Sequence, residues 1–292
     1  MERKRTVWTA LALLGLLVVA VIGVSLLISM TLDSGWLGGE KVGVIRIEGV
    51  ITDSRETIEE LRRFRDNPSI KAVVLRIDSP GGGVVPSQEI HAELLKARKD
   101  GRLKVVASMG NLAASGGYYI AVATDKIVAN PGTLTGSIGV IMELANVQGL
   151  LEKVGVQSVV IKSGRYKDLA SPFRAMSAED RALLQSVLDD VHDQFIRAVA
   201  AGRALKVEQV RDLADGRIFT GRQARTAKLV DELGDLQDSI KLAARLVGIE
   251  GEPRVVEPRK RFSFRDLLDN FFWGQGAQLV PSRINLKYLL AL

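Results

Sequence analysis

The stretch NLAASGGYYI, residues 111–120, places Ser115 between two alanines and two glycines. A strand-like run precedes it and a helical pattern follows it, so Ser115 is predicted at a strand-to-helix turn. At such a turn the serine hydroxyl is accessible, and the backbone amide of Gly116 is free to donate a hydrogen bond. Ser115 could therefore attack a carbonyl carbon while Gly116 stabilises the oxyanion. A serine that only caps the helix is the alternative interpretation.

A second glycine turn, DSPGGGV at residues 78–84, follows the apolar run KAVVLRID. Three glycines allow the backbone to approach a ligand closely and to expose its amides. The spacing matches neither GxGxxG nor GxxxxGK[ST], which argues against a site for nucleotide phosphates. The remaining interpretations are a tight strand-to-helix turn and an oxyanion-binding turn for acyl transfer.

A serine nucleophile needs a base, and the histidines of the chain are His91 and His192. Both fall within predicted helices, which makes each a poor candidate for a Ser-His-Asp triad. The alternative base is a lysine whose pKa burial lowers from its usual value of about 10.4. The segment IKSGRYKDLASPF offers Lys162 and Lys167, and position and composition do not choose between them.

The elements that must position these residues alternate between β-branched runs and helical periodicity from Lys41 onward, which predicts an α/β domain with a layered sheet. We expect strands at KVGVIRIEGVI, KAVVLRID, KVVASM, KIVAN, SIGVI and SVVIKS. Helices are expected at TIEELRRFRDN, at residues 86–99, from residue 115, at residues 177–203 with a capping box of Ser177 and Asp180, at TGRQARTAKLV and at LQDSIKLAARLVG. No motif is duplicated, so we expect one catalytic domain.

The composition argues against several classes of function. The chain of 292 residues contains no cysteine, which excludes disulfides, a thiolate nucleophile and a cysteine-ligated metal. Its net charge of +6 arises from 40 Lys and Arg against 34 Asp and Glu that are spread along the chain. Because the aromatic-basic motifs of nucleic-acid readers are missing, we expect no nucleic acid partner.

The N-terminal segment predicts a membrane anchor. Residues 7–32 carry no charge and would form a helix of about 39 Å, which is enough to cross a bilayer with some tilt. The preceding ERKR keeps the N-terminus cytoplasmic, so the catalytic domain is expected on the outer side of the plasma membrane. A cleaved signal peptide is the rival interpretation, but the apolar run is long for one and no convincing cleavage site follows it.

Five regions are therefore predicted. They are a cytoplasmic N-terminus at 1–6, a transmembrane signal anchor at 7–32, a linker at 33–40, the catalytic domain at 41–252 and a tail at 253–292. The tail mixes Arg and Lys with Phe and Trp, as segments at a membrane interface do. Docking onto a neighbouring subunit or onto the body of the domain is the alternative interpretation of the tail.

Together, LRIDSPGGGV, SMGNLAASGGYYIA, ANPGTLTGSIGVI and SGRYKDLASPF, in this order behind the N-terminal segment, resemble the signal peptide peptidase A family in its short, single-domain form. The resemblance covers nearly the whole chain. It implies a ClpP/crotonase-like fold with stacked β-sheets surrounded by helices. It also implies a serine endopeptidase that needs no metal and no nucleotide cofactor.

The resemblance assigns roles to five positions, which are Ser115, Lys167, Ser137, Gly82 and Gly116. It makes Ser115 the nucleophile and Lys167 the general base, in preference to Lys162. Ser137 would orient the lysine amine, and the two glycine amides would bind the oxyanion. The mechanism that follows needs a neutral Lys167, so we expect this lysine to be buried, Asp168 to point away from it and activity to fall on acidification.

The resemblance further implies what the protease acts on and where. Its substrates would be residual signal peptides and other hydrophobic peptide segments at the membrane, and lipid would be a partner through the anchor and tail. A ring- or dome-shaped homo-oligomer, such as an octamer, would build its catalytic grooves from neighbouring subunits. The alternatives are another Ser-Lys membrane protease of the NfeD-linked type, a crotonase-like thioester enzyme and a non-catalytic membrane scaffold of the same fold.

Overall fold

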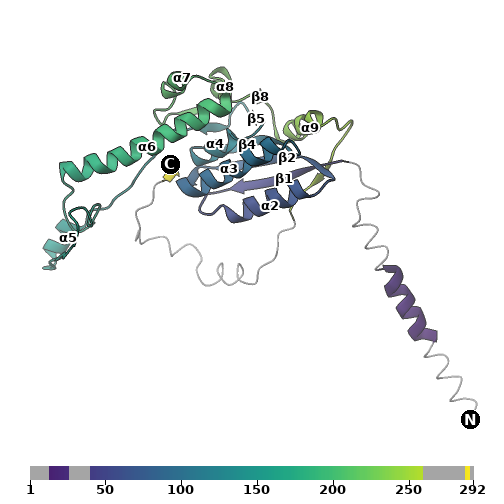
Figure 1. The fold of residues 1–292 in the computed structure, drawn as a ribbon, viewed down its shortest axis with the longest axis horizontal. Helices are drawn as coiled ribbons and strands as arrows, with labels where there is room; N and C mark the ends of the chain where they lie inside the picture. Colours follow the sequence, from purple (N-terminus) through teal and green to yellow (C-terminus); the bar gives the residue numbers. More distant parts are fainter. Residues whose placement is uncertain (1–12, 26–39, 259–286, 290–292) are drawn as a thin grey trace, which may run out of the picture.

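The computed structural model of this chain describes residues 13–25, 40–258 and 287–289. Within these ranges, an eight-stranded sheet has helices packed on both of its faces (Figure 1). A small two-stranded sheet lies beside it. The α/β architecture predicted from the alternating sequence pattern is thus confirmed.

The main sheet is largely parallel. Its strands run in the order β7-β6-β4-β2-β1-β9, and β5 pairs both with β4 and with β8. Among the described strands of this sheet, β7 alone runs antiparallel to its neighbour, β6. The strand bounds are β1 Lys41–Glu48, β2 Ile70–Ser79, β3 Gly81–Gly83, β4 Lys104–Ala114, β5 Lys126–Ala129, β6 Leu134–Gly136, β7 Ile218–Thr220, β8 Glu232–Leu233, β9 Arg254–Val256 and β10 Lys287–Leu289.

Two hydrophobic clusters fill the two faces of the sheet. Ile45 and Leu75 belong to the cluster that is covered by α2, α3, α4 and α6, whereas Val44 and Val74 pack against α9. Successive side chains of a strand point to opposite faces, so a strand covered on both sides is apolar at nearly every position. The helix bounds are α2 Arg55–Asp66, α3 Val84–Asp100, α4 Gly116–Ala121, α5 Gln148–Lys153, α6 Ala178–Arg203, α7 Val207–Arg211, α8 Gly221–Thr226 and α9 Leu236–Leu246.

Two of the predicted strands are wrong. The strand expected at SIGVI, residues 137–141, lies earlier in the chain, where residues 134–136 form β6. Ser137 has a φ of 49°, which is outside the extended conformation of a strand. At SVVIKS, residues 158–163 form no strand, and Val159 and Ile161 are 82% and 98% exposed. A β-branched run forms a strand when a neighbouring strand and a packed face stabilise it, and this run has neither among the described residues.

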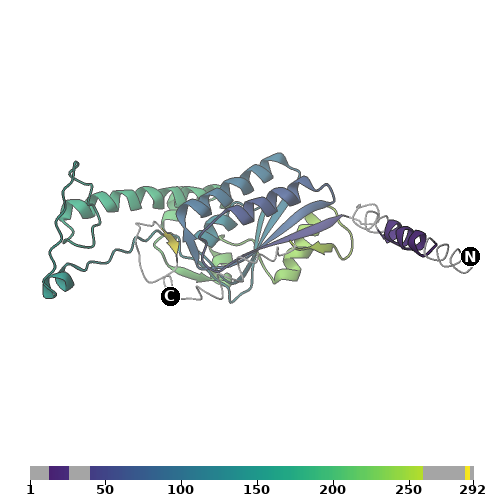
Figure 2. The same cartoon turned by 90° about the horizontal axis from the view of Figure 1, so that it is seen from below.

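Residues 142–177, which we call the arm, extend away from the sheet, and the chain returns to the sheet along α6 (Figures 1 and 2). The arm contains α5 and is held by contacts of its own, such as the 2.7 Å hydrogen bond from Val147 N to Pro172 O.

The predicted capping box is present at the start of α6, where Asp180 N donates to Ser177 Oγ at 3.0 Å and Ser177 N donates to Asp180 at 3.1 Å.

The two ends of the chain are described in part. Residues 13–25 of the predicted anchor are helical, and the rest of residues 1–39 lies outside the described ranges. No helix within the described ranges is both long and apolar enough to span a membrane. The predicted tail is described at β9, which pairs with β1, and at β10, which pairs with β3. Both described parts of the tail therefore pack on the body of the domain.

Candidate active site

Ser115 joins the end of β4 to the start of α4, as predicted. Its φ of 53° and ψ of −115° are sparsely populated by residues other than glycine. Ser115 N donates to Gly136 O, and the Ser115 carbonyl accepts from Tyr119 N, each at 2.8 Å. The side chain is 1% exposed, and its Oγ has no hydrogen-bond partner among the described residues. A buried, unpaired hydroxyl in a strained turn lowers stability, which favours a chemical role over simple helix capping.

The predicted oxyanion turn lies beside Ser115. Gly81–Gly83 form β3 directly after β2, and a Cβ built on Gly82 would lie 2.1 Å from the carbonyl oxygen of Ile51, so the position excludes a side chain. A Cβ built on Gly116 would lie 3.2 Å from the amide nitrogen of Gly82. The fold thus brings together the two glycines expected to bind an oxyanion, from turns that follow two adjacent parallel strands.

Two buried serines that the sequence analysis did not single out fix this turn. Ser79 Oγ donates to Gly49 O at 2.6 Å and accepts from Gly81 N at 3.0 Å. Ser87 Oγ donates to Gly83 O at 2.8 Å, and it lies 2.6 Å from the position of a Cβ built on Gly116. One serine therefore holds each end of β3. For Ser87, the available sequence signal is a serine four residues after the last glycine, at the start of a helix.

We expect Ser87→Ala to lower kcat for peptide hydrolysis about fivefold with little change in KM, because a buried hydrogen bond contributes about 1 kcal/mol and here it orients the oxyanion strand. Steady-state kinetics on one peptide substrate measures both constants. Ser239→Ala is the matched control, since Ser239 is also fully buried and donates to the carbonyl four residues earlier, at Asp235, but on α9. Equal effects of the two variants would assign Ser87 a purely structural role.

Ser137 lies next to Ser115 because of strand register. Ala114 pairs with Gly136 across β4 and β6, so the residues that follow the two strand ends are neighbours. Ser137 is 6% exposed, and its amide donates to Arg217 O at 2.8 Å. It also lines a cavity of about 510 Å³ together with residues of α6. Ser115 and Ser137, both assigned to the site by the resemblance, are therefore neighbours in the fold.

Lys167 does not reach this site within one chain. It is exposed, in the arm, and so it lacks the burial that we expected of it. Its neighbour Tyr166 is hydrogen-bonded to Glu179 in the first turn of α6, whereas Tyr119 of the site packs on Phe195 of the same helix at 5.0 Å between ring centroids. Glu179 and Phe195 are separated by about 24 Å along the helix axis.

The carboxylate of Asp168 is engaged away from Lys167. Arg174 Nε donates to it at 2.9 Å, and Lys162 forms a further ion pair with it at 2.5 Å. Hydrogen bonds from these two cations, that of Arg174 first, lower the pKa of Asp168 to about 2. Lys162 is thus occupied as an ion-pair partner, which supports the choice of Lys167 over Lys162 as the candidate base.

Neither histidine forms a triad with Ser115. His91, on α3, packs against the Tyr119 ring at 4.7 Å, and His192, on α6, lines the same cavity as Ser137. The Nε2 of His192 is buried and has no partner among the described residues, a feature that its place in a helical sequence pattern did not indicate. Because Ser115 Oγ is equally unpaired, these two atoms form no hydrogen bond with each other.

Burial, with a smaller contribution from Arg98, lowers the pKa of His91 from 6.5 to about 4. As the pH falls, His91 is therefore protonated in the unfolded chain at a higher pH than in the folded protein. The contribution of neutral His91 to the free energy of unfolding is complete above pH 6.5. It is lost as the pH falls toward 4, and the loss is at most about 3 kcal/mol. We expect urea unfolding to show this decline between about pH 6.5 and about pH 4.5, above the range where most carboxylates titrate. His91→Gln should lack it, and a wild-type protein of constant stability over this range would contradict the assignment.

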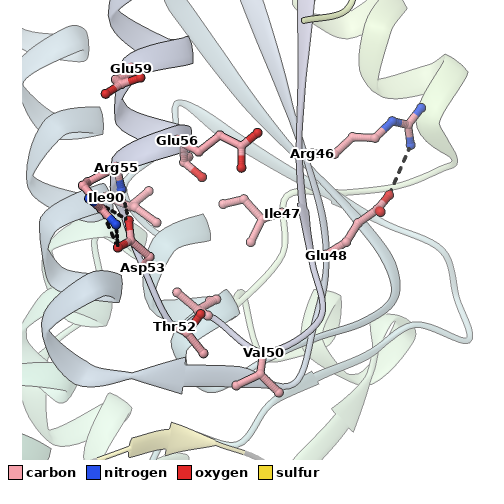
Figure 3. A pocket seen from close by; sticks show the side chains of 12 residues that line it. Arg46, Ile47, Glu48, Val50, Thr52, Asp53, Arg55, Glu56, Glu59 and Ile90 are labelled. Carbon is pink, nitrogen blue, oxygen red and sulfur yellow. Dashed lines mark hydrogen bonds and ion pairs between the residues drawn. The ribbon is translucent and has the colours of Figure 1, made fainter. Parts of the chain in front are cut away.

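A further cavity, of about 540 Å³, lies between β1 and α2 (Figure 3). Two pairs of its charged side chains are in contact, Arg46 with Glu48 and Arg55 with Asp53. The predicted catalytic residues are not among those that line it. The cavity adjoins the glycine turn at Ile51, which bridges to Gly82, but none of the predicted catalytic side chains enters its lining.

Comparison with known proteins gives a consistent result. Residues 97–250, which include Ser115, Ser137 and Lys167, match the profile of peptidase family S49. The chain is 47% identical over 212 residues to a putative protease of Synechocystis sp., covering 72% of this chain and 76% of the relative. It is 38% identical over 232 residues to a putative signal peptide peptidase SppA of Enterococcus faecium, covering 74% and 67%. It is 32% identical over 271 residues to a putative protease of Methanocaldococcus jannaschii, covering 87% and 86%.

Proposed function

Because this chain belongs to peptidase family S49 and is an SppA-like serine protease, we propose that it cleaves peptide bonds with a dyad of Ser115 and Lys167. The observation that carries the proposal is the buried, unpaired Oγ of Ser115 in a strained turn beside Gly82 and Gly116. The fold is taken to be of the ClpP/crotonase type, in which the two glycine turns face one substrate groove.

The chemistry is acyl transfer to Ser115 followed by hydrolysis. The neutral amine of Lys167 accepts the Ser115 proton while Oγ attacks the carbonyl carbon, and the amides of Gly82 and Gly116 bind the oxyanion. Lys167 then gives the proton to the leaving amine, and a water molecule that it deprotonates releases the acyl group. Ser137, one residue beyond the paired ends of β4 and β6, accepts a hydrogen bond from the lysine and orients it.

The lysine comes from a second copy of the chain. Within its own chain, Lys167 lies near the N-terminal end of α6, far from Ser115. The arm that carries Lys167 also exposes apolar side chains that a neighbouring subunit would cover. These include Leu150, Val154, Val159 and Ile161, which are between 61% and 98% exposed. The cavity beside Ser137, of about 510 Å³, is large enough to admit a lysine side chain. A ring- or dome-shaped homo-oligomer gives every serine a neighbour's lysine.

The protease works at a membrane on apolar peptide segments, including residual signal peptides. The support is the uncharged run at residues 7–32, which is long enough to span a bilayer, and the basic stretch before it, which sets the orientation. With the N-terminus cytoplasmic, the catalytic domain lies outside the plasma membrane. Signal peptides that remain in the bilayer after cleavage are then within reach of the site.

The test uses the full-length chain in detergent with casein and a fluorogenic apolar peptide. We expect hydrolysis of both, and we expect a fluorophosphonate, which phosphonylates an activated serine with loss of fluoride, to stop it while adding one label, located at Ser115 by peptide mass analysis. An assembled oligomer that cleaves neither substrate and takes up no label would overturn the proposal in favour of a non-catalytic scaffold. Labelling at a different serine would reject the assignment of Ser115.

A further inference from the structure

Arg174, in the arm, binds two carboxylates, one of which belongs to the residue after the proposed base. Its Nε and Nη2 donate to the carboxylate of Asp168 at 2.9 Å and 3.3 Å, and Nη2 also donates to the Asp168 carbonyl at 3.2 Å. Its Nη1 donates to Asp180 at 2.5 Å. A guanidinium presents its donors in a fixed plane, so one side chain holds both carboxylates in a defined arrangement. Arg174 thus links the segment that carries Lys167 to the first turn of α6.

The carboxylate of Asp168 is largely removed from solvent. Its side chain is only 10% exposed, and two cations contact it among the described residues, Arg174 and Lys162. A carboxylate that is shielded from water requires such partners, and its attraction to any nearby cation is weakly screened. Loss of Arg174 would therefore leave Asp168 available to the next cation along the chain.

That next cation is Lys167, which directly precedes Asp168 in the sequence. No carboxylate within the described ranges forms an ion pair with Lys167. A carboxylate within about 4–6 Å of an amine favours the charged amine and raises its pKa by about one unit or more. Since the base must be neutral, a pair between Asp168 and Lys167 would lower the fraction of active enzyme at a given pH.

The acidic residues of α6 that face the arm have partners of their own. Glu179 forms an ion pair with Arg165. Asp180 binds Arg174 and also accepts a hydrogen bond from the backbone amide of the N-cap residue at 3.1 Å. If Arg174 is removed, Asp180 keeps its bond to the N-cap, whereas Asp168 keeps one of its two cations. Asp168 is therefore the carboxylate that such a change would free.

The cavity beside Ser137, which would receive the lysine of a neighbouring chain, has three titratable side chains in its lining, Asp189, His192 and Asp215. They would act on the entering lysine in the same way whether or not Arg174 is present in the arm. A difference between the wild-type protein and an Arg174 variant therefore reports on Asp168.

We propose that Arg174 is a positioning residue for the base: it holds the carboxylate of Asp168 against α6, and so prevents Asp168 from pairing with Lys167 and keeping its amine charged. The inference rests on the proposed function for the role of Lys167, and it adds the group that sets the working pH range of that lysine. Because Arg174 and Lys162 lower the pKa of Asp168 to about 2, its carboxylate is charged at any pH at which a lysine base works. The contact with Arg174, and not protonation, therefore keeps Asp168 from Lys167.

Arg174→Gln tests the proposal through the pH profile of the full-length protein. We expect the acid limb of kcat/KM for peptide hydrolysis to move to higher pH by about one unit, because the freed carboxylate stabilises the charged amine of Lys167. On that limb the shift is a loss of about tenfold, whereas activity well above it should approach that of the wild type. A loss of the same size at every pH, with the limb unmoved, would overturn the proposal and make Arg174 a purely structural residue.

Two further variants separate the effect of charge from that of structure. The double variant Asp168→Asn, Arg174→Gln removes the freed charge, so its acid limb should return to the wild-type position. Arg165→Gln is the matched control, because Arg165 also joins the arm to the first turn of α6 but does so through Glu179, and its side chain is 72% exposed, so its charge is screened. We expect its acid limb to stay in place. A limb that remains shifted in the double variant, or that shifts equally in Arg165→Gln, would overturn the proposal.

Titration of the amine without catalysis separates this inference from the proposed function. In full-length oligomers that carry Ser115→Ala, acetic anhydride acetylates neutral lysine amines with release of acetate, and peptide mass analysis follows the labelling of Lys167 as the pH is varied. We expect the midpoint for Lys167 to lie about one pH unit higher with Arg174→Gln than without it. This shift supports the inference even if the wild-type protein hydrolyses nothing, in which case only the proposed function has failed. Equal midpoints overturn the inference even if hydrolysis is fast.

Discussion

Ser115→Ala is expected to lower kcat/KM for peptide hydrolysis by about 10⁴-fold or more, since the attacking atom is lost and the binding groups alone retain little catalysis. Stability should be unchanged or slightly higher, because the removed hydroxyl is buried and unpaired. Loss of activity together with an equal or raised Tm is the signature of a residue kept for chemistry at a cost in stability. Peptide hydrolysis and thermal unfolding of the same preparations measure both effects.

His192→Asn is the matched control for this experiment, because His192 carries the other buried, unpaired side-chain atom among the described residues and lines the cavity beside Ser137. We expect its activity to remain within a few-fold of wild type. A loss as large as that of Ser115→Ala would make His192 the base and would remove Lys167 from the mechanism. Full activity of Ser115→Ala itself would reject the nucleophile.

Subunit complementation is the second large effect. Ser115→Ala and Lys167→Ala are each expected to be inactive when expressed alone. When the two are co-expressed in equal amounts, random assembly into a closed ring places an intact serine beside an intact lysine at about a quarter of the sites. We therefore expect about a quarter of wild-type activity from the mixture, measured as peptide hydrolysis per mole of purified oligomer.

The control is co-expression of Lys167→Ala with the double variant Ser115→Ala, Lys167→Ala, which provides intact serines but no intact lysine and should stay inactive. If the first mixture is also inactive while its oligomer is assembled, the arm of each chain must swing back to its own serine. That outcome would contradict the intersubunit site. A wild-type protein that sediments as a fully active monomer would contradict it too.

Local sequence determines much of the fold. The run KAVVLRID is apolar on both sides of its pleat because β2 is covered by helices on one face and by α9 on the other. The capping box of Ser177 and Asp180 sets the start of α6, since its hydrogen bonds lie within four consecutive residues. The predicted strand at SVVIKS was wrong because strand formation depends on partners far away in sequence, and the part of the chain that the structure describes provides none there.

The sequence by itself determined the chemical groups of the site: a serine before two glycines at the end of a strand, a glycine turn after the neighbouring strand, and lysines in a separate segment. The tertiary structure decided which of these groups meet. The register of β4 and β6 placed Ser115 beside Ser137, and the contact between the turns at Gly116 and Gly82 placed Ser115 beside Gly82. The length of α6, in contrast, keeps Lys167 away from Ser115. It also decided that Tyr288, distant in sequence, lies opposite Gly82 and stacks on Tyr119. Register, helix length and long-range pairing depend on the packing of the whole chain, so local sequence patterns do not determine them.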